Sequence, residues 1–540
     1  MTLMIAAVGL LWGIGACVRV YQQARFYQIE EYMSQRYIRW LFSARGRWLP
    51  TRSVAAGIGG IFAGLFVGDT TFVTLIILLI AGAIAVYPQP PGEVKKGFVR
   101  TKRATRILGA SFAVALLLAI LAVAVARPIL DGELSLVAAH TLGFLIWWSA
   151  PFILVLGALL MEPVEENIRN GFKRQAQAKL HRVNPVVIGI TGSYGKTSTK
   201  HYIAHILGGK YRTFPTPKSW NTIMGVTRAI NEKMPDDAEV FICEMGAYVP
   251  GEIEGIAALT KPTVSIVTEV GPQHLERFKT LGNIAIAKYE IIKALPPDGV
   301  GVFNFDNVHI QGMIAKNHPE TRLAVSRELS PEAAKQSEVR FVATGITESL
   351  DGLTFTVTDT ETSHSTEFVT SLVGLHNVTN ILLATAVAIN MDMTLENVAA
   401  RVRSLQPAEA RLVRNVLPNG MTIINDAYSA NPVGALSSLR VLGMHSTGRR
   451  LLITPGMVEL GTLHETENHR LGEHAARYTT DVILVGAEQT QPVRAGLESA
   501  GFPPEHLMVM ETVTEAIAWY QQHLGNGDTV LFLNDLPDTY

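Results

Sequence analysis

The residues that most directly indicate chemistry form a glycine-rich stretch that ends in Gly195, Lys196 and Thr197. The stretch follows an apolar run and precedes a helix-like segment, so backbone N–H groups and a helix N-terminus can surround phosphate groups. The Lys196 ammonium can reach β- and γ-phosphates, and the Thr197 hydroxyl can ligate Mg²⁺. Ile190 replaces the first glycine of the common phosphate-loop pattern, but the remaining features together still predict a nucleotide site. The predicted phosphate-binding residues are Thr191, Gly192, Ser193, Tyr194, Gly195, Lys196, Thr197 and Ser198.

The elements that would position this loop alternate between short apolar strands and helix-like segments. After the run that ends at Thr191, strands are expected at Glu239–Cys243, Thr263–Thr268 and Gly301–Phe305. Such alternation predicts a parallel α/β sheet. Ligands bind at the carboxyl edge of parallel strands, and Glu244 directly follows one of them. Taken alone, Glu244 is also compatible with a solvated strand end.

The pattern changes in the second half of the chain. Thr/Val/Phe alternation around Gly345–Leu372 predicts antiparallel strands, and a helix is expected at His376–Asn390. A second α/β series begins near Arg411. Its predicted strands are Met421–Asn425, Arg450–Thr454, Asp481–Val485 and Thr529–Leu533.

The first 162 residues hold most of the apolar excess of the chain. Ile107–Ala126 and Leu136–Met161 approach the roughly 20 residues that cross a bilayer. Met1–Val18 is a third candidate, and Ser53–Tyr87 is long enough for a hairpin of two spans with Asp69 at its tip. We therefore predict about five transmembrane helices, with the lipid bilayer as a partner.

Basic residues predict the orientation of these helices. They fill the loops at 19–52 and 95–106, whereas the Asp69 tip and the 127–133 connection carry few. By the positive-inside rule both basic loops are cytoplasmic, which places the N-terminus outside and everything after Met161 inside. The prediction is a multi-pass protein of the inner (cell) membrane with its α/β part in the cytoplasm.

Composition excludes other classes of protein. The net charge is −1, so overall electrostatics favour no nucleic acid. Cys17 and Cys243 are the two cysteines, and both lie in apolar runs, which argues against a disulfide framework.

The phosphate loop belongs to an ordered series of motifs that resembles the Mur ligase family, the ATP-dependent amide-forming enzymes of peptidoglycan assembly, and is most similar to its MurF branch. Each motif keeps the order of that branch along the soluble part of the chain. Besides the loop, the motifs are Thr216–Val226, Glu244–Ala247, Pro250–Ile253, Val267–Phe278, Ala287–Glu290, Asn304–Asn307, Gly374–Asn380 and Asp426–Pro432.

The apolar runs predict an α-helical membrane domain (residues 1–162), followed by a connector (163–183). For the rest of the chain the resemblance implies a central P-loop parallel-sheet ATPase domain (184–405) and a Rossmann-like α/β C-terminal domain (406–540). It implies a reaction in which a carboxylate attacks the ATP γ-phosphate and an amine captures the acyl phosphate. The substrates would be ATP, a carboxylate, and an amine from an amino acid or dipeptide. One or two Mg²⁺ ions would be cofactors, and Lys288 could carry a carbamate.

The resemblance also implies roles for single residues. Thr197, Glu244, His274 and Lys288 would surround the metal, and Lys196, His274 and Lys288 would be catalytic. The nucleotide would contact Asn304, His376, Asn377, Asn380, Arg411 and Asp426. Without the family, His274 is equally compatible with a structural histidine and Lys288 with a helix-surface lysine.

The chain departs from the family at both ends. Membrane helices stand where MurF enzymes carry a small soluble domain, Glu269 replaces a customary asparagine, and Asn534-Asp535 replaces a lysine-glycine-serine stretch. These departures leave the joined molecules open. The alternatives are a ligase of poly-γ-glutamate type and a membrane ATPase that drives transport or regulation. The oligomeric state is not predicted.

Overall fold

The computed structural model describes residues 1–540 except 68–69, 88–96, 130–131, 409–410, 429–430 and 535–540. The predicted hairpin tip at Asp69 and the family departure at Asp535 therefore lie outside the described residues. The chain divides into two compact units, Met1–Asn170 and Gly171–Leu536. Each unit is described by itself below.

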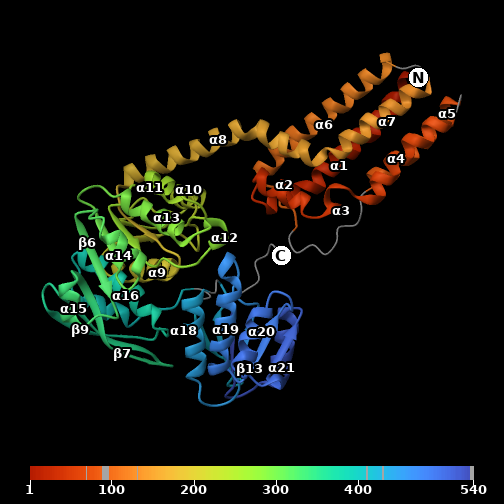
Figure 1. Ribbon diagram of the computed structural model, residues 1–540. Coiled ribbons are helices and arrows are strands. Elements are labelled where there is room, and N and C mark those ends of the chain that lie inside the picture. Colours follow the sequence, from red (N-terminus) through yellow and green to blue (C-terminus); the bar gives the residue numbers. More distant parts are fainter. Residues whose placement is uncertain (68–69, 88–96, 130–131, 409–410, 429–430, 535–540) are drawn as a thin grey trace. The chain divides into compact units, whose positions relative to one another are not determined.

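The first unit is helical, as predicted (Figure 1). Its described helices are α1 (Thr2–Ile29), α2 (Ser34–Phe42), α3 (Arg45–Trp48), α4 (Thr51–Phe66), α5 (Thr71–Val86), α6 (Lys102–Ile129), α7 (Glu133–Trp148) and the first part of α8 (Ala150–Val183). Trp12 donates to Nδ1 of His140 over 3.2 Å, and Nε2 of His140 lies 3.1 Å from the Gly57 carbonyl oxygen. Both nitrogens of His140 are thus engaged in helix packing.

Fewer helices than predicted meet the requirements for a membrane span. Among the described residues, α1 and α6 are long and apolar enough, and α7 with α8 would add a third if the pair counts as one span. The predicted span over Leu136–Met161 is interrupted at Ser149, which separates α7 from α8, and the two helices are bent by 63°. Helices α4 and α5 have 16 residues each, short of the roughly 20 that a bilayer requires.

The second unit contains a nine-stranded sheet in the order β2-β3-β1-β4-β5-β6-β7-β8-β9. Strands β2 to β7 are parallel neighbours, while β7, β8 and β9 are antiparallel extensions of the same sheet, as their alternating pattern predicts. The strands are β1 (Val186–Thr191), β2 (Thr213–Pro215), β3 (Val240–Glu244), β4 (Val264–Val267), β5 (Val300–Asn304), β6 (Thr321–Ser326), β7 (Val339–Ser349), β8 (Gly352–Asp359) and β9 (His364–Thr370).

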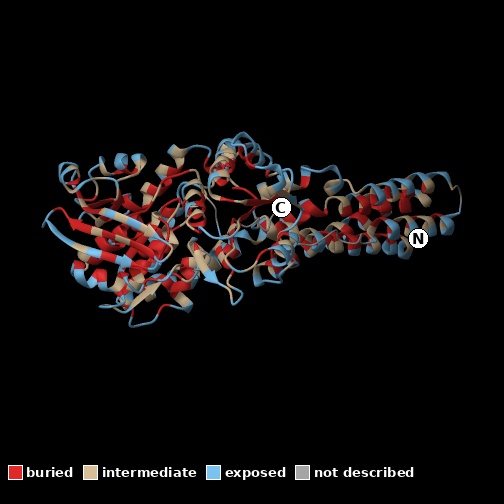
Figure 2. Cartoon of the chain, turned by 90° about the horizontal axis from the view of Figure 1, so that it is seen from below, coloured by how far each residue is buried: buried red, intermediate tan, exposed pale blue. Residues whose placement is uncertain are grey.

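Helices cover both faces of the parallel strands, and alternate strand residues enter the two cores. Ile188 and Ile190 pack with α9 (Lys196–Leu207), α16 (His376–Asn390) and α17 (Leu395–Val402). Val187 belongs to the opposite core, together with residues of α8, α10, α11, α13 and α14. These strands are largely buried (red in Figure 2). The remaining helices are α10 (Ile223–Glu232), α11 (Glu252–Thr260), α12 (Leu275–Phe278), α13 (Leu281–Lys293), α14 (Val308–Ile314) and α15 (Pro331–Gln336).

A six-stranded sheet follows in the same unit, in the order β10-β11-β15-β12-β13-β14. Strand β10 is antiparallel to β11, and the other pairs are parallel. The elements are β10 (Val413–Val416), β11 (Thr422–Asp426), α18 (Pro432–Gly443), β12 (Arg450–Thr454), η1 (Gly461–Leu463), α19 (His464–Tyr478), β13 (Asp481–Val485), α20 (Gln491–Ser499), η2 (Pro504–His506), β14 (Leu507–Met510), α21 (Val513–His523) and β15 (Thr529–Leu533). Helices followed by mixed α/β sheets confirm the predicted fold class.

Candidate functional site

The glycine-rich stretch forms a tight connection between β1 and α9. Gly192 has a φ of +154° and Gly195 a φ of +80°, conformations that side chains disfavour. A Cβ on Gly192 would lie 2.0 Å from Oγ1 of Thr268, which follows the neighbouring strand β4. Gly195 is the N-cap of α9, so the first N–H groups of that helix are directed toward the loop. This is the geometry of a phosphate-binding loop.

Three of the predicted phosphate-binding residues hold the loop with their side chains. The Thr191 hydroxyl donates to the Met245 carbonyl over 2.9 Å, and the Ser193 hydroxyl donates to the Gly271 carbonyl over 2.9 Å. The Tyr194 ring packs against Gly271, and its buried hydroxyl has no hydrogen-bond partner in the described part of the chain. These side chains stabilise the shape of the loop, and the backbone N–H groups of the loop remain the candidates for binding phosphates.

Lys196 lies folded over this loop. Its ammonium donates to the carbonyls of Gly192 over 2.6 Å and Ser193 over 3.1 Å. Burial, together with the charge of Arg411, lowers the pKa of Lys196 to about 8, although the Glu244 carboxylate opposes this shift. The effect of Arg411 places this predicted nucleotide-binding residue within electrostatic range of the loop. An anion bound here would favour the charged form of Lys196.

Glu244 is the centre of a buried polar network at the end of β3. Thr197 donates its hydroxyl to both Glu244 carboxylate oxygens, over 3.2 and 3.1 Å, and Asn221 donates its amide over 3.1 Å. The Lys200 ammonium donates to Glu244 over 2.9 Å, and both of these side chains are 1% exposed. Burial raises the pKa of Glu244, but the charges of Lys200 and Lys196 dominate together and keep it below its ordinary value. Glu244 is therefore an anion.

Lys200 was not predicted to be a site residue. It follows Lys196 and Thr197 by one helical turn in α9, and the turn brings it to the same side of the helix. That spacing is the signal that could have identified it. The pairing with Glu244 is not visible in the sequence, because it joins residues 44 positions apart.

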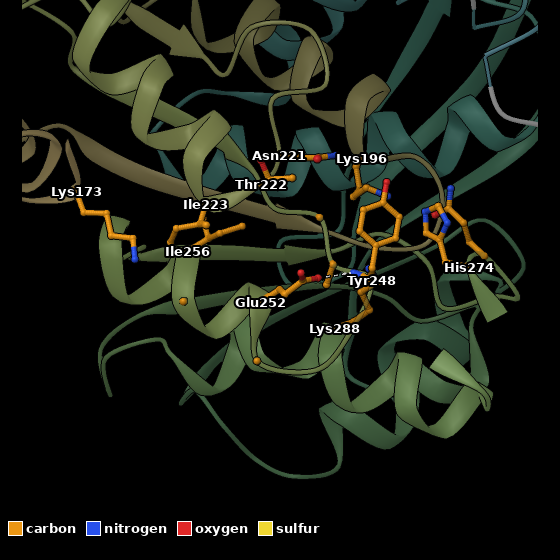
Figure 3. A pocket seen from close by; sticks show the side chains of 15 residues that line it. Lys173, Lys196, Asn221, Thr222, Ile223, Tyr248, Glu252, Ile256, His274 and Lys288 are labelled. Atoms are coloured by element: carbon orange, nitrogen blue, oxygen red, sulfur yellow. Dashed lines mark hydrogen bonds between the residues drawn. The ribbon is translucent and has the colours of Figure 1, made fainter. Parts of the chain in front are cut away.

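His274 and Lys288 line a cavity of about 270 Å³ together with Lys196 (Figure 3). His274 has a left-handed backbone, and its Nδ1 pairs with the Glu459 carboxylate of the loop after β12. Lys288 is 3% exposed on α13, and burial lowers its pKa well below the ordinary value. Burial thus favours the uncharged amine of Lys288, and the uncharged amine is the form from which a carbamate is made.

The predicted metal ligands are only partly brought together. Thr197 and Glu244 are in contact, whereas neither His274 nor Lys288 hydrogen bonds to Glu244 among the described residues. The described part of the chain holds no cluster of three or more carboxylate, histidine or cysteine side chains suited to a metal. Mg²⁺ is commonly held by one or two carboxylates plus substrate phosphates. One anionic carboxylate and a hydroxyl beside a phosphate loop fit that pattern.

The predicted nucleotide-contacting asparagines are bonded within the protein. The amide oxygen of Asn377 accepts from the Tyr202 hydroxyl over 2.8 Å, and that of Asn380 accepts from Thr199 over 3.2 Å. These bonds join α16 to α9. Asn304 donates to the Thr268 carbonyl over 3.0 Å and to the Glu269 carboxylate over 3.0 Å. Their role toward a nucleotide stays a prediction.

The remaining predicted residues lie where the six-stranded sheet approaches the site. Asp426 accepts from the Ser438 hydroxyl over 2.6 Å, and the Arg411 guanidinium stacks over Tyr428 at 4.3 Å. Nδ1 of His376 lies 3.0 Å from the Ser437 hydroxyl, and His376 lines a second cavity of about 480 Å³. This cavity also contains the cationic residues Arg327, Arg440 and Arg470, which the sequence did not identify as site residues.

A phosphate loop at the carboxyl edge of a parallel sheet, beside a buried carboxylate, defines a nucleotide-binding α/β protein of the kind that catalyses group transfer. The comparisons with known proteins narrow this class. Residues 190–388 match the Mur ligase middle domain, and residues 410–534 match the Mur ligase, glutamate ligase domain.

Two curated relatives are named UDP-N-acetylmuramoyl-tripeptide–D-alanyl-D-alanine ligase. The Bacillus subtilis relative is 30% identical over 298 residues, which are 55% of this chain and 62% of the relative. The Escherichia coli relative is 30% identical over 340 residues, which are 62% of this chain and 72% of the relative. The chain thus spans about two thirds of the length of these relatives. It belongs to the Mur ligase family, in the MurF branch.

Solved structures agree on the fold. MurF from Acinetobacter baumannii has a TM-score of 0.59 at 23% identity, covering 69% of this chain and 78% of that one. MurF from Thermotoga maritima, in complex with ADP, has a TM-score of 0.58 at 22% identity. The match covers 68% of this chain and 80% of that one. The α/β unit therefore has the Mur ligase fold.

Proposed function

We propose that this chain is an ATP-dependent ligase that joins a carboxylate to an amine through an acyl phosphate. The observation that carries the proposal is that Lys196 of the phosphate loop lines one cavity with His274 and Lys288. A carboxylate in this cavity lies beside the groups that would bind the γ-phosphate. Such positioning, with cations that offset the charge of two anionic reactants, is the main requirement of phosphoryl transfer.

Each residue has a distinct part in this proposal. Lys196 leaves the Gly192 and Ser193 carbonyls and binds the phosphates of ATP. Thr197 and Glu244 would hold Mg²⁺, which supplies charge neutralisation at the phosphates. Lys288, as a carbamate, would provide an anionic oxygen ligand for a second ion. Arg411 and Asp426 would bind the nucleotide from the C-terminal sheet, and Asn304, His376, Asn377 and Asn380 would border its adenosine part.

The substrates are proposed from the named relatives. By that analogy, the carboxylate belongs to a UDP-N-acetylmuramoyl-tripeptide, the amine to D-alanyl-D-alanine, and the product is a peptidoglycan precursor. The poly-γ-glutamate and transport alternatives have no support among these relatives. We further propose the division into residues 1–162, 163–183, 184–405 and 406–540, with the first part in the cell membrane and the others in the cytoplasm. The length and apolar composition of helices α1 and α6 support the membrane location of the first part.

The decisive experiment supplies purified protein with ATP, Mg²⁺, UDP-N-acetylmuramoyl-tripeptide and D-alanyl-D-alanine, and measures ADP together with the new amide. We expect ADP release to require both acceptors and to match amide formation. Lys196→Ala should lower turnover by at least about 100-fold, because it removes a cation that stabilises the transferring phosphoryl group. ADP release that is independent of the acid and the amine would contradict the ligase assignment.

A further inference from the structure

The cavity beside the phosphate loop extends beyond the reacting groups to a lysine on α8. Lys173 lines this cavity at the end opposite His274 and Tyr248, with Ile223 and Ile256 between the two ends (Figure 3). No hydrogen bond or ion pair joins the Lys173 ammonium to another residue of the described chain. Lys173 also lies outside the residues 190–388 and 410–534 that match the family domains.

The helix that carries Lys173 is fixed against the α/β unit. Ala176 and Leu180 of α8 are buried in the core that contains α10, α11 and α13. The Asn231 amide donates to the Phe172 carbonyl over 3.0 Å, and the Lys179 ammonium donates to the Met234 carbonyl over 2.5 Å. Lys173 is half-buried in this packed segment, and its side chain lines the cavity (Figure 3).

Among the described residues, Lys173 forms no ion pair with the acidic residue that lines the cavity. Glu252 is the acid among the residues that line it, and its carboxylate accepts the backbone N–H groups of Tyr248 over 2.6 Å and Val249 over 3.2 Å. Lys173 and Lys196 thus line the same cavity, and Ile223 and Ile256 give its wall an apolar part beside Asn221, Thr222 and Glu252. A ligand with two anionic groups separated by an apolar linker complements this arrangement.

We propose that Lys173 forms a subsite for a second anionic group of the acid substrate, close to its reacting carboxylate. The inference rests on the proposed ligase function, in which the reacting carboxylate lies at the Lys196 end. A volume of about 270 Å³ is below the roughly 300–1,000 Å³ of pockets that enclose a whole small ligand, so the cavity holds the reacting end of a larger molecule. The second anion is therefore a carboxylate on the terminal residue, and Lys173 determines specificity for it.

The test uses the full-length protein in detergent with ADP and Mg²⁺, and measures binding by calorimetry. Two acids are compared: UDP-N-acetylmuramoyl-tripeptide ending in diaminopimelate, and the same compound with its second carboxylate as a carboxamide. We expect the carboxylate compound to bind about tenfold more tightly, as a charge-assisted contact predicts. Lys173→Met should abolish this preference, and Lys173→Arg should retain it. The KM for ATP should stay unchanged in both variants.

Matched controls separate the subsite from a general charge effect. Arg174→Met removes a charge from the exposed neighbour of Lys173, which does not line the cavity, and should leave the preference intact. The tripeptide without UDP should keep the preference. Three results would overturn the subsite. The natural protein could bind the two acids equally, or Lys173→Met could weaken the binding of both acids equally. The third is a preference that is lost when the UDP group is removed from the substrate.

The outcomes also separate this inference from the proposed function. Amide formation with both acids at equal KM would support the ligase and refute the subsite. A preference that depends on Lys173, without any amide product, would support the subsite and refute the ligase. Binding of neither acid would refute both.

Discussion

Lys200 and Glu244 form an ion pair beneath the phosphate loop, and both side chains are 1% exposed. A buried pair contributes little net stability compared with apolar residues, but loss of one member leaves an uncompensated charge. Here the pair also fixes the carboxylate that contacts Thr197. Lys200 is therefore a positioning residue, because it acts on the site through Glu244.

Lys200→Met is expected to destabilise the α/β unit by about 3–5 kcal/mol, because Glu244 would remain buried without its main counter-charge. The free energy of unfolding from denaturant titration measures this effect. Lys233→Met, at an exposed lysine, should change it by less than about 0.5 kcal/mol. In the double variant Lys200→Met/Glu244→Gln the loss should be smaller than the sum of the single losses; additive losses would show that the pair is not coupled.

Glu269 predicts a pH dependence of stability. Burial raises the pKa of Glu269 to about 7, and the hydrogen bond from Asn307 offsets this only in part. Between the ordinary glutamate pKa and a pH of about 7, Glu269 is therefore protonated in the folded state and ionised in the unfolded state. Stability from this group is complete below the ordinary pKa and is lost as the pH rises through about 7.

Glu269→Gln should remove this pH dependence, and at pH values above about 7 the variant should have a higher thermal midpoint than the natural protein. Each kcal/mol corresponds to roughly 2–4 °C for a domain of this size. The measurement is the midpoint from pH 5 to pH 8 for the natural protein and the variant. Parallel curves for the two proteins would contradict the assigned role of Glu269.

The strand β1, the glycine-rich connection and helix α9 act together at the scale of elements. The loop passes close to the segment after β4, and Gly192 allows this approach because it has no Cβ. The hydrogen bonds of Thr191 and Ser193 then fix the connection to two neighbouring strand ends. The phosphate-binding shape therefore depends on the sheet as much as on the loop.

Gly192→Ala should abolish ATP binding, because its Cβ would meet Thr268 Oγ1 at 2.0 Å in a disfavoured backbone conformation. Equilibrium binding of a fluorescent ATP analogue checks this. Gly312→Ala on α14 is the matched control, since a Cβ there has nothing within 4 Å. It should leave binding unchanged and stabilise the helix by roughly 0.5–1 kcal/mol. Normal binding by Gly192→Ala would show that the loop has another conformation.

At the scale of the whole molecule, an apolar helical unit and an α/β unit share the helix α8. Helix α1 has 28 residues, or about 40 Å at 1.5 Å per residue, which exceeds a hydrocarbon core of about 30 Å. The full chain is expected to remain in the membrane fraction after salt and alkaline carbonate washes. Residues 171–540 expressed alone should be found in the soluble fraction. Release of the full chain by carbonate would contradict membrane insertion.

The orientation is tested separately. A reporter fused after Met161 should have cytoplasmic activity, because basic residues crowd the loops at 19–52 and 95–106. A reporter with external activity would overturn this orientation and would remove the α/β unit from the compartment that contains ATP.

Features that depend on neighbouring residues were predictable from the sequence. The bounds of α16, β12, β13 and β15 agree with the predicted ranges, because apolar periodicity and flanking polar residues are local. Strands β2, β10 and β14 were missed. Each of them is an edge strand, which pairs on one side and needs no continuous apolar run. The short strand β6 was also missed, although it lies inside the large sheet.

The sequence by itself determined the phosphate loop, the alternation of strands and helices, and the apolar character of the first 162 residues, since each is encoded in contiguous residues. The tertiary structure decided which distant side chains meet. It paired Lys200 with Glu244 and His274 with Glu459, bound Asn377 and Asn380 to α9, and brought Lys173 to the cavity of Lys196. These contacts arise from the packing of helices on a sheet, which no local pattern specifies.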